Sequence, residues 1–212
     1  MHTTVLTASQ LAVLDGLTAI APVREFYLAG GTALALRHGH RRSVDFDFFR
    51  QPLFDTEALA VALDGVFGDL QRLPTGEQTL YVRLQGVTTS FFRYPHRMLE
   101  STEPTPWGFG MASDADIGAM KIEAVAGRGS RKDFVDLYVL CRSGLSLEIL
   151  FELFDRKFGT TRTERYHRLR ALSYFEDAEL EPMPDMLVPF DWDAAKRFFT
   201  TEATRLLGAQ GL

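Results

Sequence analysis

The feature that most constrains this chain is a pair of acidic residues inside an otherwise apolar run. Asp45 and Asp47 alternate with three apolar neighbours, Val44, Phe46 and Phe48. Because successive side chains of a β-strand point to opposite faces, this alternation predicts a strand. Its apolar side chains would enter a core, and both carboxylates would emerge together on the other face.

Two carboxylates on one face of a strand favour the binding of a divalent cation. Mg²⁺ prefers oxygen ligands, takes one or two protein carboxylates and fills its remaining positions with water and substrate phosphates. Mn²⁺ accepts similar ligands. Asp45 and Asp47 are therefore predicted to hold Mg²⁺ or Mn²⁺, with the phosphates of a substrate as the further ligands.

A glycine pair upstream of the aspartates predicts a phosphate site. Residues 25–29 form a short apolar run, Gly30 and Gly31 allow the backbone to approach a ligand, and residues 32–36 open a helix. The amide groups and the dipole of a helix start attract anions. Gly30, Gly31 and Thr32 are predicted to seat phosphates, although capping of the helix is the commoner role for a hydroxyl at this position.

Two blocks of the sequence resemble the AbiEii/AbiGii toxin branch of the nucleotidyltransferases, which share the DNA polymerase β-like catalytic fold. The first block, residues 30–49, contains the glycine pair and the two aspartates. The second block, residues 116–140, resembles the later lysine-containing and aspartate-containing motifs of the family, in the expected order. Together the matches span residues 26–140.

The resemblance implies an α+β fold, in which the mixed sheet of a polymerase β-like nucleotidyltransferase, with flanking helices, is followed by a C-terminal helical region. We expect residues 1–110 to form the nucleotidyltransferase core. Residues 111–212 are expected to form the helical region that completes the active-site cleft.

The apolar periodicity gives a coarse set of expected elements. Gly39 is expected to end the first helix after the glycine pair, and Gln85 and Gly86 to form a hairpin turn. Trp107 and Phe109 lie in an expected loop, where packing on the core is preferred over lining a base pocket. Helices are predicted over residues 7–21, 32–36, 55–63, 114–127, 131–142, 147–158, 163–175 and 191–207, strands over residues 25–29, 43–49, 67–73, 78–85 and 87–94, and an acidic surface stretch over residues 177–189.

The activity implied by the resemblance is transfer of a nucleoside monophosphate from an NTP to a hydroxyl group, with release of pyrophosphate. The acceptor would be RNA, with the tRNA 3′ end as one candidate, or a protein. In relatives the protein is the toxin of a toxin–antitoxin pair, so a DNA-binding antitoxin is an expected partner.

The resemblance also gives roles to residues of the second block. Lys121 would neutralise the charge of the triphosphate, and Arg128 lies on the same side of its helix and would join the nucleotide site. Asp133 corresponds best to the last acidic motif of the family, with Asp136 as the alternative. A structural role is also open, since either acid would brace a helical hairpin by pairing with Lys121 or Arg128.

One position departs from the pattern of polymerase β-like enzymes, which usually carry a third carboxylate on a later strand. We assign that position to Ser90, and serine supplies no negative charge. The general base is therefore open between Asp45, Asp47, Asp133 and no side chain at all.

Two other functions compete with nucleotidyl transfer. The chain would be a catalytically silent nucleotide-binding or antitoxin-docking protein of the same fold if the missing acid is essential. Asp-x-Asp motifs also occur in sugar-nucleotide glycosyltransferases, but such an enzyme would give Lys121 and Asp133 no role.

Composition limits the remaining possibilities. The 212 residues are 46% apolar, which is ample for a packed core, and the net charge of −5 does not attract nucleic acid to the protein as a whole. Basic segments at residues 37–42, 128–132 and 156–170 offer local RNA contacts or are simply solvated helix faces. The single cysteine, Cys141, excludes an internal disulfide and is expected to be a buried structural residue. No membrane span or leader is recognisable, so a cytoplasmic location is expected.

Overall fold

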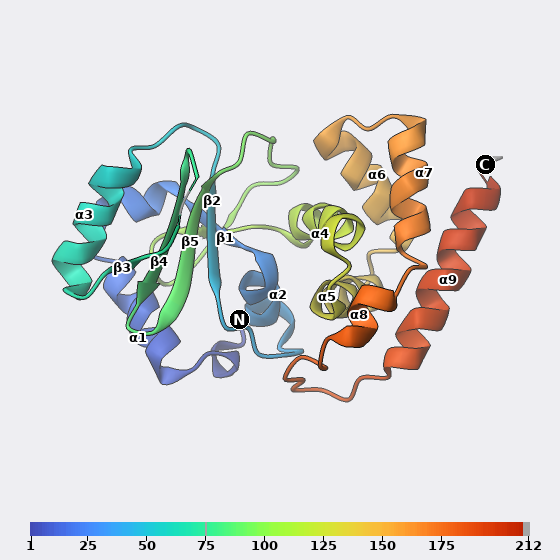
Figure 1. Cartoon of the computed structure of the whole chain (residues 1–212), viewed down its shortest axis with the longest axis horizontal. Coiled ribbons are helices and arrows are strands. Elements are labelled where there is room, and N and C mark those ends of the chain that lie inside the picture. Colours follow the sequence, from blue (N-terminus) through green and yellow to red (C-terminus); the bar gives the residue numbers. More distant parts are fainter. Residues whose placement is uncertain (75, 210–212) are drawn as a thin grey trace. The chain divides into compact units, whose positions relative to one another are not determined.

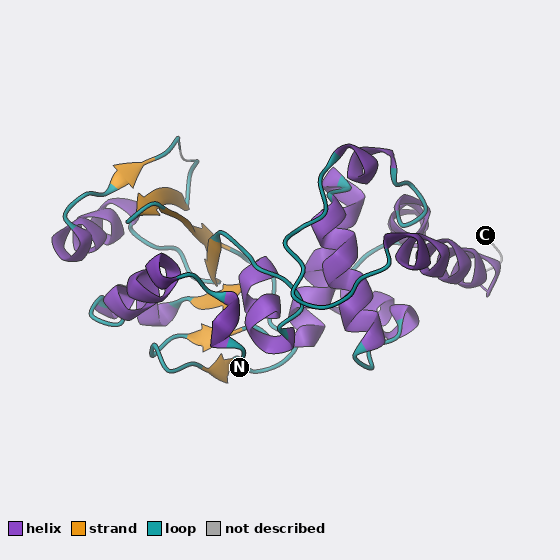
Figure 2. Ribbon diagram, turned by 90° about the horizontal axis from the view of Figure 1, so that it is seen from below, coloured by secondary structure: helices purple, strands orange, loops and turns teal. Residues whose placement is uncertain are grey.

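The structure is a computed structural model that describes residues 1–74 and 76–209. The chain divides into two compact units, Met1–Ser113 and Asp114–Leu212. Among the described residues all strands belong to the first unit, and the second consists of helices and loops (Figure 2). No described helix is long and apolar enough to cross a membrane.

The first unit is built on a mixed seven-stranded sheet with the order β3-β4-β5-β2-β1-β7-β6 (Figure 1). The strands are β1 (Tyr27–Ala29), β2 (Phe46–Arg50), β3 (Gln71–Arg72), β4 (Thr79–Leu84), β5 (Val87–Arg93), β6 (Glu103–Pro104) and β7 (Gly110–Met111). Its helical segments are η1 (Thr3–Val5), α1 (Ala8–Leu17), η2 (Ala21–Glu25), α2 (Gly30–His38) and α3 (Thr56–Phe67). The predicted α+β sheet with flanking helices is thereby confirmed.

β2 is the central strand of this sheet, antiparallel to β1 and parallel to β5. Phe46 and Phe48 have no exposed surface, whereas Asp47 between them is half-buried, so the predicted alternation is confirmed within the strand. Val44 was expected in the core, and this is wrong because the residue precedes β2 and is 73% exposed.

Aromatic side chains fill the buried face of the sheet. Phe48 stacks on Phe91 with ring centroids 5.2 Å apart, and Phe26 meets Phe91 edge-on at 5.2 Å. α1 packs on β5 and α3 packs on β4. Burial of several phenyl rings at 150–250 Å² each gives this face a large share of the hydrophobic stabilisation.

Local signals explain where most elements of the first unit begin and end. Thr7 and Gln10 form a capping box at the start of α1, and Asp55 caps α3. Gly39 ends α2 in the left-handed conformation, as predicted. The Gln85–Gly86 turn is confirmed, because both residues have positive φ, 46° and 81°.

Two further sequence predictions in the first unit are wrong. The strand expected over residues 67–73 shrinks to β3, because α3 continues through Phe67 and ends at Gly68 in the left-handed conformation. The loop expected over residues 95–109 contains β6 and leads into β7, which pairs in parallel with β1. These strands are two residues long, too short to show alternation.

The second unit contains α4 (Asp114–Arg128), α5 (Arg131–Arg142), α6 (Leu147–Phe158), α7 (Arg162–Ala171), α8 (Glu176–Leu180) and α9 (Trp192–Ala209). The predicted helices of this half are confirmed within a few residues. The acidic stretch, expected to be a surface segment, is exposed at most of its residues, and it begins within α8, which packs on α5. Glu181, which follows α8, accepts hydrogen bonds from the Ser130 hydroxyl (2.7 Å) and the Arg131 amide (2.9 Å) at the start of α5.

One ion pair of the second unit is fully buried and gives a prediction for stability. Lys157 on α6 lies with its Nζ 2.6 Å from Asp116 Oδ1 on α4, and neither side chain has exposed surface. Lys157→Met should lower the free energy of unfolding by about 3–5 kcal/mol, because it leaves a buried carboxylate without its cation. The double variant Lys157→Met/Asp116→Leu should recover most of the loss in urea denaturation. A double variant as unstable as the single one would contradict this explanation.

Candidate active site

The carboxylate of Asp47 lies directly against the first residue of α2. Asp47 pairs with Ala29, the last residue of β1, and Gly30 follows at once. A Cβ atom built on Gly30 would lie 2.7 Å from Asp47 Oδ2, and the φ of Gly30 is +67°. Glycine is therefore required twice here, for its left-handed backbone and for the space that the carboxylate occupies.

A second contact ties the other aspartate to the same helix. The Thr32 hydroxyl, which is almost fully buried, donates a short hydrogen bond to the backbone carbonyl of Asp45. The capping role preferred for Thr32 is wrong, because the N-cap residue is Ala29 and no side chain caps α2. Since the one hydroxyl proton is used within the protein, the Thr32 hydroxyl has no proton left to donate to a phosphate.

Arg41 is a site residue that the sequence analysis missed. It is 3% exposed, and its guanidinium occupies the space where a side chain on Gly31 would begin. Its Nη1 also donates to the carbonyl of Arg42 at 2.8 Å. The sequence showed only a basic loop after Gly39, so nothing distinguished Arg41 from its solvated neighbours. Its burial places a fixed positive charge beside the glycine pair.

Ser90 lies where the register of the sheet puts a neighbour of Asp47. The two residues are partners in the parallel pairing of β2 and β5, and Ser90 is 4% exposed. A carboxylate at this position would stand beside that of Asp47, so the departure noted in the sequence falls at the centre of the candidate site. Within residues 1–74 and 76–209, no group of three or more His, Cys, Asp or Glu side chains is arranged to hold a metal ion.

The donor set is still compatible with a divalent cation that also binds phosphate. Asp45 and Asp47 are half-buried, so their carboxylates are not sealed in the core. Mg²⁺ commonly takes only one or two protein carboxylates in phosphate-binding sites. The residues present therefore suit a cation that arrives with its substrate better than one caged by protein alone.

The remaining predicted site residues form a separate cluster in the second unit. Lys121 Nζ on α4 lies 2.7 Å from Asp133 Oδ1 and 2.5 Å from Asp136 Oδ2 on α5. Arg128 Nε lies 2.6 Å from Asp133 Oδ2, and its Nη2 lies 2.9 Å from Oδ1. The two aspartates have no exposed surface, whereas the Arg128 side chain is 58% exposed. Asp133 and Asp136 therefore brace the hairpin of α4 and α5, which is the structural role considered for them in the sequence analysis.

Cys141, Trp107 and Phe109 were expected to be structural residues, and Cys141 is only partly buried. Burial and the nearby Glu202 charge raise the pKa of the Cys141 thiol to about 12, which leaves almost no nucleophilic thiolate at neutral pH. Trp107 and Phe109 are 6% and 2% exposed, so the preferred packing on the core is confirmed. Phe109 contacts Phe48, and the Trp107 indole donates to Asp15 at 3.1 Å.

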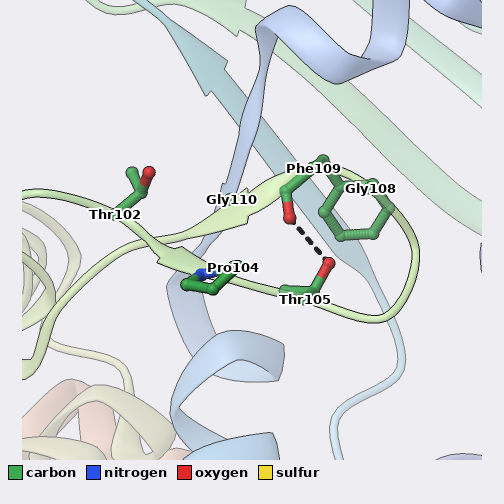
Figure 3. Close-up of a pocket in the computed structure, with 6 residues that line it drawn as sticks. All are labelled: Thr102, Pro104, Thr105, Gly108, Phe109 and Gly110. Carbon is green, nitrogen blue, oxygen red and sulfur yellow. Dashed lines mark hydrogen bonds between the residues drawn. The ribbon is translucent and has the colours of Figure 1, made fainter.

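A shallow hollow of about 270 Å³ opens at the β6–β7 hairpin (Figure 3). It is lined by Thr102, Pro104, Thr105, Gly108, Phe109 and Gly110. The Thr105 hydroxyl donates to the Phe109 carbonyl at 2.6 Å and fixes the turn. None of the predicted site residues lines the hollow, so it is not part of the candidate active site.

The contact between Gly30 and Asp47 gives a test in stability. Gly30→Ala should lower the free energy of unfolding by at least about 1–2 kcal/mol, because alanine is strained at positive φ and its methyl group would displace the carboxylate. Gly65→Ala is the matched control. That glycine lies in α3 with no atom near its missing Cβ, so alanine should stabilise by about 0.5–1 kcal/mol. Equal effects in chemical denaturation would refute the close contact.

The pKa of Asp133 gives a test by the pH dependence of stability. Burial alone would raise the pKa of Asp133, but the Lys121 charge and the Arg128 hydrogen bonds outweigh burial and hold that pKa below its usual value. A lowered folded-state pKa contributes stability above the unfolded value, near pH 4, and the contribution is lost as pH falls through the folded value. Asp133→Asn should therefore destabilise the protein at neutral pH and flatten the loss of stability below pH 4. Asp69→Asn, at an exposed position, is the control and should change stability at neutral pH by no more than about 0.5 kcal/mol.

Comparisons with known proteins give the chain its family. The family model for "Nucleotidyl transferase AbiEii toxin, Type IV TA system" matches residues 13–106 and 108–205. An uncharacterized protein of Aquifex aeolicus is 36% identical over 206 residues, which cover 95% of this chain and 98% of that protein.

Solved structures show the same fold at lower identity. MenT4, a nucleotidyltransferase toxin from Mycobacterium tuberculosis, superposes with a TM-score of 0.57 at 20% identity, over 91% of this chain and 80% of that one. JHP933 from Helicobacter pylori gives 0.56 at 16% identity, over 99% and 93%. The antibiotic-resistance factor ANT(2″)-Ia gives 0.56 at 15% identity, over 80% and 97%. With the family model covering nearly all of both units, this chain belongs to the AbiEii nucleotidyltransferase toxin family of type IV toxin–antitoxin systems.

Proposed function

We propose that this chain moves a nucleoside monophosphate from an NTP to a hydroxyl group of RNA or of a protein, releases pyrophosphate, and acts as the toxin of a toxin–antitoxin pair. The observation that carries the proposal is the contact between the Asp47 carboxylate and Gly30 at the start of α2. A cation-binding acid and an anion-binding helix start meet there, as transfer from a triphosphate requires.

The phosphates are seated on the first turn of α2. The first amides of an α-helix have no acceptor within the helix, and the dipole makes this end positive. Gly30, Gly31 and Thr32 form this first turn, and the two glycines bring no side chain of their own to it. Arg41, buried against Gly31, adds a full positive charge beside the seat.

Asp45 and Asp47 are proposed to hold Mg²⁺ or Mn²⁺. When bound, the cation neutralises phosphate charge and polarises the phosphoryl group. The contribution of the chain is to fix the two acids. Asp47 is held by its strand and by Gly30, and the backbone of Asp45 is held by Thr32.

The cluster of the second unit is proposed to serve the triphosphate through its cations. Lys121 carries a charge that Asp133 and Asp136 hold in place, and Arg128 exposes more than half of its side chain. Arg128 is therefore the residue of this cluster that a nucleotide reaches most easily. Asp133 orients both cations by its hydrogen bonds.

The choice of general base narrows on chemical grounds. A carboxylate whose pKa is lowered by two cations accepts a proton poorly, so Asp133 is the weakest candidate. Ser90 carries no charge at neutral pH. We assign proton removal from the acceptor hydroxyl to Asp45 or Asp47, or to solvent.

A second candidate function is supported by Ser90. If the carboxylate missing there is essential, the chain binds nucleotide or a DNA-binding antitoxin without catalysis. In either case the expected ligands, NTP with RNA or an antitoxin, are molecules of the cytoplasm, where we place the protein.

The test is incorporation of label from α-labelled NTPs. With Mg²⁺ and total small RNA, the protein should transfer label from at least one of the four nucleotides, and Asp47→Asn should reduce transfer by about a thousandfold or more. Asparagine keeps the shape of the side chain, so the variant should unfold at nearly the same urea concentration. Asp15→Asn, whose carboxylate contacts Trp107, is a control in the same unit and should remain active.

Labelled protein in place of labelled RNA would identify a protein acceptor. If neither becomes labelled with any nucleotide, while nucleotide still stabilises the fold, the silent alternative replaces the transferase.

A further inference from the structure

A row of aromatic side chains crosses the sheet beside the aspartates, on the face opposite the core. Phe49 follows Asp47 by two residues, so both lie on one face of β2, about 7 Å apart along the strand. Tyr27 on β1 and Phe92 on β5 are the cross-strand partners of Phe49. Tyr81 on β4 pairs with Ser90 and lies on the same face. The aromatic row consists of Tyr27, Phe49, Phe92, Tyr81 and Tyr94.

The rings of the aromatic row touch one another in sequence. Phe49 stacks on Phe92 with centroids 5.1 Å apart and planes inclined by 24°, and Tyr27 stacks on Phe49 at 6.0 Å and 27°. Tyr81 meets Phe92 edge-on at 5.4 Å, and Tyr94 meets Phe49 at 5.4 Å with planes inclined by 70°. The row is thus one continuous surface across four strands.

Four of the five rings of the aromatic row are only half-buried, and the fifth, Tyr27, is 9% exposed. Phe49, Tyr81, Phe92 and Tyr94 all keep part of their area exposed, unlike the phenyl rings on the core face, several of which have none. Large contiguous apolar surfaces left partly exposed mark binding sites more often than they mark incomplete packing. The core does not need these rings, because Phe46, Phe48 and Phe91 already fill it.

Positive charges flank the aromatic row. Arg83 follows Tyr81 by two residues on the same face of β4 and is exposed. After β5 the chain continues as Arg93-Tyr94-Pro95-His96-Arg97, in which both arginines are exposed and His96 packs on Tyr94 at 4.9 Å. Interleaved aromatic and cationic residues on a sheet are the pattern that binds single-stranded nucleic acid, with bases on the rings and arginines on the phosphates.

We propose that the aromatic row binds the single-stranded end of an RNA acceptor and places its last nucleotide beside Asp47. The inference rests on the proposed transfer reaction and names the acceptor class for that site. A double-stranded acceptor fits poorly, because its bases are already stacked on one another and cannot use the rings. The row also explains how a chain of net charge −5 would recognise RNA, since stacking replaces much of the electrostatic attraction.

Fluorescence anisotropy with a labelled single-stranded RNA about ten nucleotides long measures this binding directly. Phe92→Leu and Tyr94→Leu should each weaken binding by about tenfold, because a leucine side chain keeps apolar volume but offers no ring to a base. Arg83→Gln should weaken binding and lower the slope of log affinity against log salt by about 0.7, the value for one phosphate contact on a single strand. Urea midpoints check that each variant is folded.

Two controls separate this proposal from a general effect and from the transfer reaction. Phe67→Ala removes a half-buried ring that packs on Gly16 of α1, in the helices that cover the core face, and should not change RNA binding. Asp47→Asn should bind RNA at least as tightly as the native chain while transferring no label. If the native chain binds RNA on the row but transfers label to neither RNA nor protein, the proposed function is refuted and the row remains an RNA-binding surface.

Ultraviolet cross-linking supplies a readout that does not depend on substitutions. Bound RNA should cross-link to the peptides of the native protein that contain the aromatic row, which include Tyr27, Phe49 and residues 79–97. The proposal is wrong if the native chain does not bind the RNA, if the leucine variants bind it equally well, or if cross-links map elsewhere. If the variants lose only a complex with a DNA-binding antitoxin, the aromatic row belongs to a protein partner.

Discussion

The structure of the first unit depends on one close approach, that of the Asp47 carboxylate to the backbone of Gly30. β1 ends at Ala29, opposite Asp47, and the chain must turn immediately into α2. Any side chain at Gly30 would meet the carboxylate, and a left-handed backbone there suits only glycine. The start of the helix and the position of the acid thus meet in a single contact, which any side chain at Gly30 would disturb.

The sequence predicted those parts of this arrangement that depend on residues close together in the chain. Alternation around Asp47 predicted β2 and its buried face, and Gly39 predicted the end of α2. The burial of Arg41 was not predictable, because a buried arginine in a loop depends on a glycine ten positions earlier that only the fold brings near. Thr32 was misread for a similar reason. Its hydroxyl was close enough in sequence to cap the helix, but the carbonyl of Asp45, thirteen residues away, is the acceptor.

Three charged residues of the second unit's cluster are buried, whereas the two aspartates at the sheet are only half-buried. Lys121, Asp133 and Asp136 are buried together, and burial of ions is costly unless each is paired and hydrogen-bonded. Helical spacing in the sequence indicated that Asp133 and Asp136 would approach Lys121, and this was correct. Their complete burial was not evident from the helical spacing, which shows neighbours within a helix and not what packs over them. An ion cluster of this kind holds α4 and α5 in one register, and that register fixes the exposed guanidinium of Arg128.

The two faces of the sheet have different roles in the first unit, because one packs into the core and the other carries the candidate site. Phe48 and Phe91 fill one face with rings that have no exposed surface, which supplies the stability. On the other face, β2 carries the carboxylate of Asp47 and the ring of Phe49, and both residues are half-buried. Because strand residues alternate, the same five-residue strand delivers core side chains and site side chains at once. A shift of one residue in the pairing of β2 would exchange the two sets and bury Asp47 in place of Phe48, so packing of the core itself selects the register that the chemistry needs.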